Sequence, residues 1–187
     1  MAIKMSKKTR LVLVIVIIAV VALIAIVLSR NFSSPVDDYE LAMIVALDEN
    51  RETFVNYCQK YNNSRGAIPF TLFVDGEGLV RYVKIGAFTS ETELWDTIDN
   101  LSDSTPQPQE APNFTLPTMT GANITLSELE GTPVVLNFWS ISCYWCRKQL
   151  PYLESVAQQS VGEIKVIAVN IADTAASVQK FFGTAIP

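Results

Sequence analysis

The sequence predicts an α/β domain that follows one membrane-spanning helix. Segments typical of strands and helices alternate along most of the chain, and the most regular of them, 134–152, runs from an apolar strand into an amphipathic helix. Upstream, residues 11–28 are 18 uncharged aliphatic residues. As a helix this run would be about 27 Å long, which is close to the thickness of a bilayer core.

The N-terminal segment carries an orientation signal. Residues 1–10 contain four cations and no acidic residue. Because positive residues are retained on the cytoplasmic side, we expect a single-pass protein of the cell membrane, with a cytoplasmic N-terminus and everything after the anchor outside. A cleaved signal peptide is the alternative, but the apolar run is long for a signal core and residues 27–30 make a poor cleavage site. Residues 29–38 have the composition of a linker.

Composition excludes several classes of function. The net charge is −5 although the first ten residues carry four cations, so the exterior part is acidic and nucleic acid is not an expected partner. Histidine is absent, which excludes Ser-His and Cys-His catalysis. Three cysteines without histidine supply too few ligands for a metal site, and no motif indicates a cofactor.

Residues 39–102 are expected to form a β-α-β-β-α unit. The first helix has Asp48 and Asn50 as candidate caps, and the last begins at a capping box made by Ser90 and Glu93. The expected elements are a strand at 41–47, a helix ending near Tyr61, strands at 70–74 and 79–85 around a turn at 75–78, and a helix ending near Ser102.

Cys58 lies on the apolar stripe of the first of these helices, without a second cysteine nearby in the sequence. A buried structural thiol is the favoured interpretation. A third redox-active cysteine is the alternative.

Residues 103–112 are proline-rich and polar, which is typical of a linker or a long surface crossing. The remaining segment, 113–187, is expected to begin with short extended pieces. It then continues through the cysteine-bearing strand and helix to a strand at 164–171 and a helix at 174–182.

Cys143 and Cys146 sit where a strand gives way to a helix. Free backbone N–H groups and the positive end of the helix dipole stabilise a thiolate there. Cys143 is therefore the candidate nucleophile. Cys146, one helical turn further on, is placed to attack a mixed disulfide formed on Cys143 and release the partner.

Three blocks of the second half together resemble the TlpA/ResA group of thioredoxin-like proteins, which are membrane-anchored thiol-disulfide oxidoreductases outside the bacterial cytoplasmic membrane. The resemblance covers residues 111 to about 182 and implies a thioredoxin-like three-layer α/β sandwich. The blocks are Ala111 to Pro117, Leu126 to Trp139, and Cys143-x-x-Cys146-Arg-Lys-x-x-Pro151.

The resemblance also implies roles and partners. Cys143 would attack and Cys146 would resolve, Trp139 would flank the site, and Pro151 would kink the active-site helix. The expected partners are protein dithiols and disulfides outside the membrane, cytochrome c precursors among them, and an upstream electron donor in the membrane. Reduction of such substrates fits the resemblance better than oxidation.

The sequence departs from this group next to the cysteines. Ser142 stands where the group usually has tryptophan, and Tyr144-Trp145 is bulky for the dipeptide between the cysteines, which leaves the direction of electron flow open. Asn137 occupies a strand position where some thioredoxins place a buried acid. The proline that a peroxiredoxin motif requires is missing before Cys143.

Side chains near the cysteines have two interpretations. Trp139, Tyr144 and Trp145 could form a docking surface, although we favour core packing for Trp139 and exposure for the other two. Lys148 and the helix dipole are the local features that would lower a cysteine pKa.

The order of the two halves is unusual for a thioredoxin-like chain, because the part resembling the second half, with Pro69, precedes the cysteines. Three explanations remain: a degenerate module followed by one cut short at Pro187, one permuted domain with Pro69 brought against Cys143, or separate pieces. A repeated strand-helix pattern favours tandem origin. Residues 113–187 alone would leave one edge of their sheet unpaired. Strands of the first half could pair with this edge, which favours one composite sheet.

The leading functional hypothesis is a membrane-tethered disulfide oxidoreductase. The alternative from a different class is a non-catalytic binding or scaffold module in which Cys143 and Cys146 form an inert disulfide.

Overall fold

The structure, a computed structural model, describes residues 41–101 and 108–185. Within these two ranges no helix is both long and apolar enough to cross a bilayer. The predicted anchor at 11–28 and the predicted linker at 29–38 lie outside the described residues, so their assignment stays a prediction.

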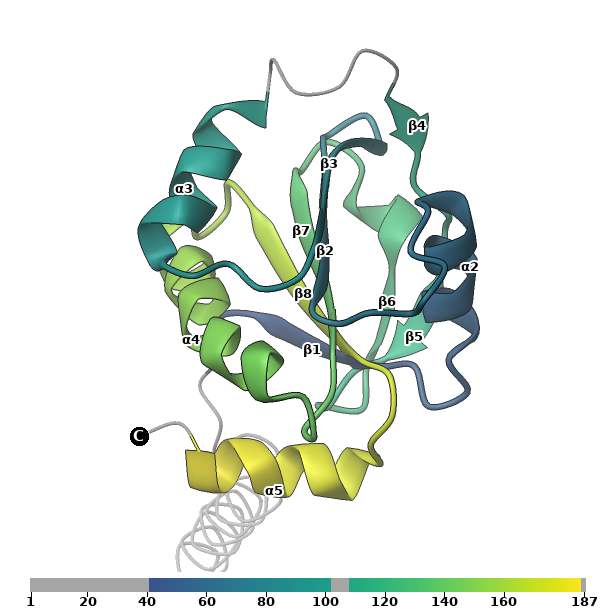
Figure 1. Ribbon diagram of the computed structural model, residues 1–187, viewed down its shortest axis with the longest axis vertical. Helices are drawn as coiled ribbons and strands as arrows, with labels where there is room; N and C mark the ends of the chain where they lie inside the picture. The colour runs from purple at the N-terminus through teal and green to yellow at the C-terminus, as the bar shows by residue number, and fades with distance from the viewer. Residues whose placement is uncertain (1–40, 102–107, 186–187) are drawn as a thin grey trace, which may run out of the picture. The chain divides into compact units, whose positions relative to one another are not determined.

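A six-stranded mixed sheet forms the centre of the domain (Figure 1). Its strand order is β1-β8-β7-β2-β3-β4, in which β1, β8 and β7 are parallel to one another and the remaining strands are antiparallel to their neighbours. The strands are β1 (Ile44–Leu47), β2 (Phe70–Val74), β3 (Leu79–Ile85), β4 (Gln109–Glu110), β7 (Val134–Trp139) and β8 (Lys165–Asn170).

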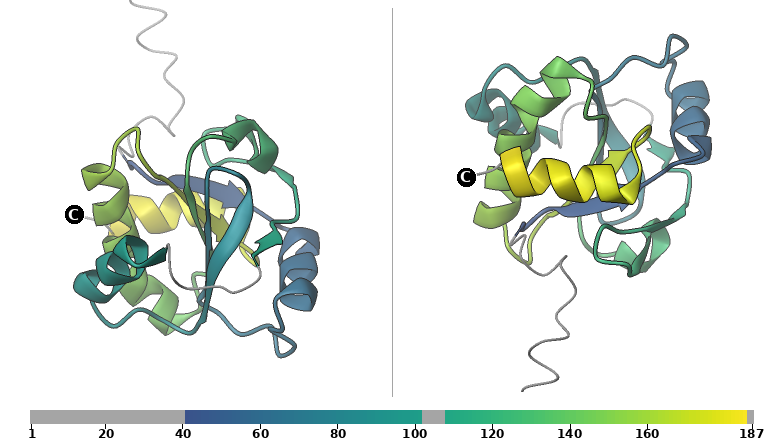
Figure 2. Two further views of the ribbon diagram at one scale, coloured as in Figure 1. Left: turned by 90° about the horizontal axis from the view of Figure 1, so that it is seen from above. Right: turned by 90° about the horizontal axis from the view of Figure 1, so that it is seen from below.

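Helices cover both faces of this sheet, giving three layers (Figures 1 and 2). One face carries α3 (Glu91–Asp99) and α4 (Tyr144–Gln159), and the other carries α2 (Glu52–Lys60) together with a small second sheet. The remaining elements are β5 (Thr115–Pro117) and β6 (Asn123–Thr125) of that second sheet, the 3-10 helix η2 (Leu126–Leu129), and α5 (Ala175–Ala185). The arrangement is the thioredoxin-like α/β fold expected from the sequence.

The central strand β7 is buried along its whole length because both of its faces are covered. Phe138 points to the α2 side, where its ring packs with those of Phe54, Tyr57 and Phe70. The neighbouring Trp139 points to the opposite side and packs against α5. An almost continuous apolar run is what such a doubly covered strand requires.

The two sequence halves share this one sheet. Strand β2 of the first half pairs with β7 of the second, with Phe70 opposite Phe138, and β1 of the first half pairs with β8. A buried carboxylate adds a further link, because Glu154 on α4 accepts hydrogen bonds from the backbone N–H groups of Ala42 (2.8 Å) and Met43 (3.0 Å). The two halves therefore form the one composite sheet that the unpaired edge favoured, and they are not separate pieces.

Helix α2 begins differently from the capping expected on the sequence. Arg51 occupies the N-cap position with φ 62, which is a left-handed conformation. The predicted caps still act nearby, since the Asp48 carboxylate accepts from Phe54 N at 2.7 Å and Asn50 accepts from Glu52 N. The carboxylate therefore satisfies helix donors from one turn upstream.

Two other expected segments differ in detail. Gln109 and Glu110, inside the predicted linker 103–112, form β4 and pair with Leu79 and Val80. The capping box is half formed: Ser90 accepts from Glu93 N, but the Glu93 carboxylate turns to Thr89 N and Lys84 instead.

Candidate active site

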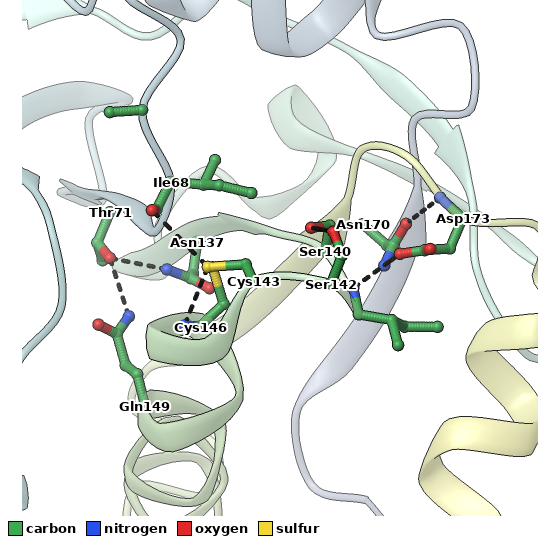
Figure 3. Close-up of a disulfide and its surroundings, with 12 residues drawn as sticks. Ile68, Thr71, Asn137, Ser140, Ser142, Cys143, Cys146, Gln149, Asn170 and Asp173 are labelled. Atoms are coloured by element: carbon green, nitrogen blue, oxygen red, sulfur yellow. Dashed lines mark hydrogen bonds between the residues drawn. A yellow bond between two sulfur atoms is a disulfide. The ribbon is translucent and has the colours of Figure 1, made fainter.

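Cys143 and Cys146 form a disulfide at the start of α4 (Figure 3). Cys143 is the N-cap residue, and its Sγ accepts a hydrogen bond from Cys146 N at 3.1 Å. Cys143 is partly exposed, whereas Cys146 is only 1% exposed. The pair thus has one sulfur that a partner can reach and one that the protein covers.

The chain before β2 lies directly against the reachable sulfur. The Ile68–Pro69 peptide bond is cis, and the Ile68 carbonyl oxygen lies 3.7 Å from Cys143 Sγ. In the dithiol form a Cys143 thiol could donate to this oxygen. The structure therefore brings Pro69 of the first half against the cysteines of the second, across 75 residues of sequence.

A cluster of neutral polar side chains lies beside the disulfide (Figure 3). Thr71 Oγ1 accepts from the amide of Asn137 at 2.8 Å and from that of Gln149 at 3.2 Å, and Gln149 Oε1 accepts from Phe88 N. All three side chains are buried. Asn137 is thus held by hydrogen bonds at its strand position, and as an amide it cannot take a proton from a cysteine.

A second polar group fixes the loop that leads to Cys143. One oxygen of the Asp173 carboxylate accepts from Ile141 N at 2.8 Å and from the Asn170 amide at 2.9 Å. Asn170 in turn accepts from the backbone N–H groups of Ala172 and Asp173. The end of β8 and the end of β7 are tied together by these bonds, which sets the position of the cysteine loop.

The residues between the cysteines are exposed, as expected. Tyr144 and Trp145 are 54% and 63% exposed, and their rings meet edge to face. Lys148 Nζ lies over the Tyr144 ring, 5.7 Å from its centroid. Trp139 is 0% exposed and packs on Phe181 and Phe182, which is the core position favoured from the sequence.

Pro151 lies inside α4, where it cannot donate a backbone hydrogen bond to the preceding turn. Its position in the helix is the one that the cysteine motif implies. Whether it adjusts the angle of the cysteine-bearing turn stays a prediction.

Cys58 is a free thiol, 8% exposed, on the α2 side of the sheet. Burial raises its pKa, and the nearby Arg51 charge and a hydrogen bond with Asn63 oppose that rise. It belongs to the apolar core cluster. These features fit the structural interpretation of this cysteine.

Sequence reasoning missed three residues around the site. Thr71 and Gln149 are polar residues on otherwise apolar stripes of β2 and α4, which is the signal that could have marked them as partners of a buried polar group. Asp173 follows a predicted strand that ends beside the cysteine strand, and side chains at such ends meet at one sheet edge.

A disulfide at a strand-helix junction, with one covered sulfur and a cis-proline segment against the other, defines a thioredoxin-like dithiol/disulfide site. Comparison with known proteins agrees with this class: residues 108–184 match the AhpC/TSA family. This similarity covers the segment that carries the cysteines.

Three relatives illustrate the similarity. The thioredoxin-like protein YneN of Bacillus subtilis is 32% identical over 77 residues, covering 41% of this chain and 45% of that protein. The thiol-disulfide oxidoreductase ResA of the same organism is 34% identical over 80 residues, which cover 42% of this chain and 45% of that protein. ResA of Halalkalibacterium halodurans is 35% identical over 83 residues, which cover 42% of this chain and 47% of that protein. The chain thus spans just under half the length of these curated relatives.

Proposed function

We propose that the protein is a membrane-tethered, extracytoplasmic thiol-disulfide oxidoreductase that reduces protein disulfides through Cys143 and Cys146. The observation that carries the proposal is the placement of Cys143 at the N-cap of α4, against the Ile68 carbonyl, with Cys146 buried behind it. Two of the relatives described above are named thiol-disulfide oxidoreductases, which supports the same chemistry. The direction, as reductant, follows the TlpA/ResA resemblance.

The first step uses the reachable sulfur. In the dithiol form, the positive end of α4 and the N–H of Cys146 stabilise a Cys143 thiolate. This thiolate attacks one sulfur of a substrate disulfide, so that a new S–S bond joins Cys143 to the substrate. The other substrate sulfur leaves as a thiolate and takes a proton from water.

The second step uses the covered sulfur. Cys146 loses its proton to water and attacks Sγ of Cys143, which forms the Cys143–Cys146 disulfide and releases the second substrate sulfur as a thiol. Two electrons have then passed from the protein to the substrate. The disulfide in the structure is the product of this step. A dithiol donor in the membrane would restore the reduced pair.

Membrane tethering and the extracytoplasmic location rest on the sequence of residues 1–28. They fit the chemistry, because a disulfide persists outside the cytoplasm and is rare inside it. Oxidised extracytoplasmic proteins, including cytochrome c precursors, are the corresponding substrates.

The enzymatic proposal can be tested on the full chain in detergent, in a Cys58→Ser background so that only the pair is trapped. Equilibration in glutathione buffers should show one two-electron transition, and the reduced protein should reduce insulin disulfides. Cys143→Ser should abolish the reaction, and Cys146→Ser should accumulate the mixed disulfide. A pair that never exchanges would contradict the proposal and leave the scaffold alternative.

The location needs a separate test in intact cells. After mild reduction, a membrane-impermeant maleimide should label Cys143 in the Cys58→Ser background without cell lysis. A cysteine placed before the anchor, Ser6→Cys, should be labelled only after lysis when the pair is replaced by serine. The opposite pattern would overturn the proposed orientation.

A further inference from the structure

A pocket of about 510 Å³ lies on the α2 side of the domain. It is formed by the exposed side of α2 and the loop that leads to the cis-proline. Buried Phe54 belongs to its wall, and Gly66 marks its end nearest to that proline. The full lining is Arg51, Phe54, Val55, Cys58, Gln59, Asn62, Asn63, Ser64, Arg65 and Gly66.

The lining of this pocket is cationic. It contains the side chains of Arg51 and Arg65 and no acidic residue, although the chain as a whole has a net charge of −5. Both arginines are exposed, so either can meet a ligand in solution. Asn62 and Ser64 add neutral hydrogen-bonding groups. Two arginines without an acidic residue in the lining suit a carboxylate better than a cation.

Arg51 is held at the pocket by an unfavourable backbone conformation. Its φ of 62° lies in the left-handed region, which is unfavourable for a non-glycine residue. The guanidinium carbon lies 5.4 Å from the centroid of the Phe54 ring, on the pocket wall. Such a conformation at a cationic residue is a reason to look for a ligand.

The pocket lies next to the reacting sulfur. Gly66 lines the pocket, and Ile68, two residues later, places its carbonyl oxygen 3.7 Å from Cys143 Sγ. Two residues of extended chain span about 7 Å. The first turns of α4, which begin at the disulfide, carry Arg147 and Lys148, both exposed. Cationic side chains thus lie on α4 as well as in the pocket.

We propose that the Arg51/Arg65 pocket receives an acidic side chain from the polypeptide segment that carries the substrate cysteine. The enzyme would then prefer disulfides in acidic segments. The occupant is a substrate segment because a chain joined to Cys143 Sγ lies within a few residues of the pocket along the Ile68 backbone. This inference rests on the proposed function.

The test uses two disulfide peptides that differ only in having Asp or Lys beside the reacting cysteine. For the full chain we expect kcat/KM to be about threefold or more higher for the Asp peptide, the size typical of a partly exposed charge pair. The preference should fade at about 1 M salt, where the screening length is about 3 Å. Arg65→Glu should reverse it, and Arg51→Gln should reduce it.

Lys165→Glu is the charge-matched control for Arg65→Glu, since Lys165 is exposed at the start of β8, at the end of the sheet away from the cysteines. It should leave the peptide preference unchanged. Equal rates for the two peptides, or a preference that Arg65→Glu does not alter, would overturn the inference while leaving the oxidoreductase proposal intact. Failure to reduce either peptide would instead count against the proposed function.

Discussion

The two halves of the domain differ in what they contribute to the site. Residues 108–185 hold both cysteines of the disulfide and the segment that matches the AhpC/TSA family. Residues 41–101 supply the cis Ile68–Pro69 segment whose carbonyl lies against Cys143, Thr71 beside the disulfide, and the strand that pairs with β7. The comparison teaches that the reactive groups and the backbone that lies against them come from different halves of the chain.

The largest effect is expected from Phe138→Ala, which removes the ring that joins the halves. Phe138 belongs to the second half and packs against three rings of the first. We expect the free energy of unfolding to fall by about 3–5 kcal/mol. Chemical unfolding of the full chain, followed by circular dichroism and by labelling of the Cys58 thiol, should give one common midpoint before and after the change. Two separate midpoints would mean that the halves fold independently.

A smaller effect is expected at the carboxylate that links α4 to the chain before β1. Glu154→Ala leaves the N–H groups of Ala42 and Met43 without their acceptor, which costs about 1–3 kcal/mol in the free energy of unfolding. Glu154→Gln keeps one acceptor oxygen and should lose less. Hydrogen exchange at the Ala42 and Met43 amides shows whether the loss of stability comes from these hydrogen bonds. Unchanged protection of both amides in Glu154→Ala would argue against the hydrogen bonds to Glu154.

A change at Asp173 affects contacts within the second half, because Ile141 and Asn170, which donate hydrogen bonds to its carboxylate, both lie there. Asp173→Ala should release the backbone of Ile141 and slow the attack by Cys143 about tenfold, since small misplacements of reacting groups are costly. Asp173→Asn retains an acceptor oxygen and should restore most of the rate. Stopped-flow measurement of the first exchange step separates this effect from a change in stability. Equal rates in all three proteins would exclude a positioning role.

The smallest effect concerns an ion pair within the first half. Hydrogen bonds from Lys84 and Thr89 lower the pKa of Glu93 from 4.5 to about 2. The folded state therefore binds this proton more weakly than the unfolded state, and the resulting stability is present above pH 4.5 and lost as the pH falls toward 2. The free energy of unfolding of Glu93→Gln should depend less steeply on pH in this window. An identical pH dependence would mean that the pair contributes nothing.

Local pattern was enough to predict most of the individual elements. The apolar run before Cys143, the turn at 75–78 and the stripe of α4 each specify a strand, a hairpin or a helix from neighbouring residues, and the structure has them there. Such signals depend on periodicity and turn chemistry, which are local properties. Pairing between strands that are distant in the sequence is not a local property. The sequence therefore left open which strand pairs with β7, and with it the three explanations for the order of the two halves.

The parts of the site that escaped prediction depend on tertiary contacts. Thr71 and Gln149 meet only because β2 and α4 lie together, across 78 residues of sequence. The left-handed conformation of Arg51 has no signal in its residue type, since glycine or asparagine normally occupies such positions. The short strand β4 forms only because the edge of β3 offers a partner.

The central claim is that one substrate site is built from both halves. The most direct measurement traps a peptide on Cys143 in Cys146→Ser, with a photoreactive residue beside the peptide cysteine, and maps the cross-links by mass spectrometry. We predict cross-links to residues 64–68 of the first half, next to the Ile68 carbonyl. Cross-links confined to residues 108–185, from a mixed disulfide formed at full yield, would contradict the account.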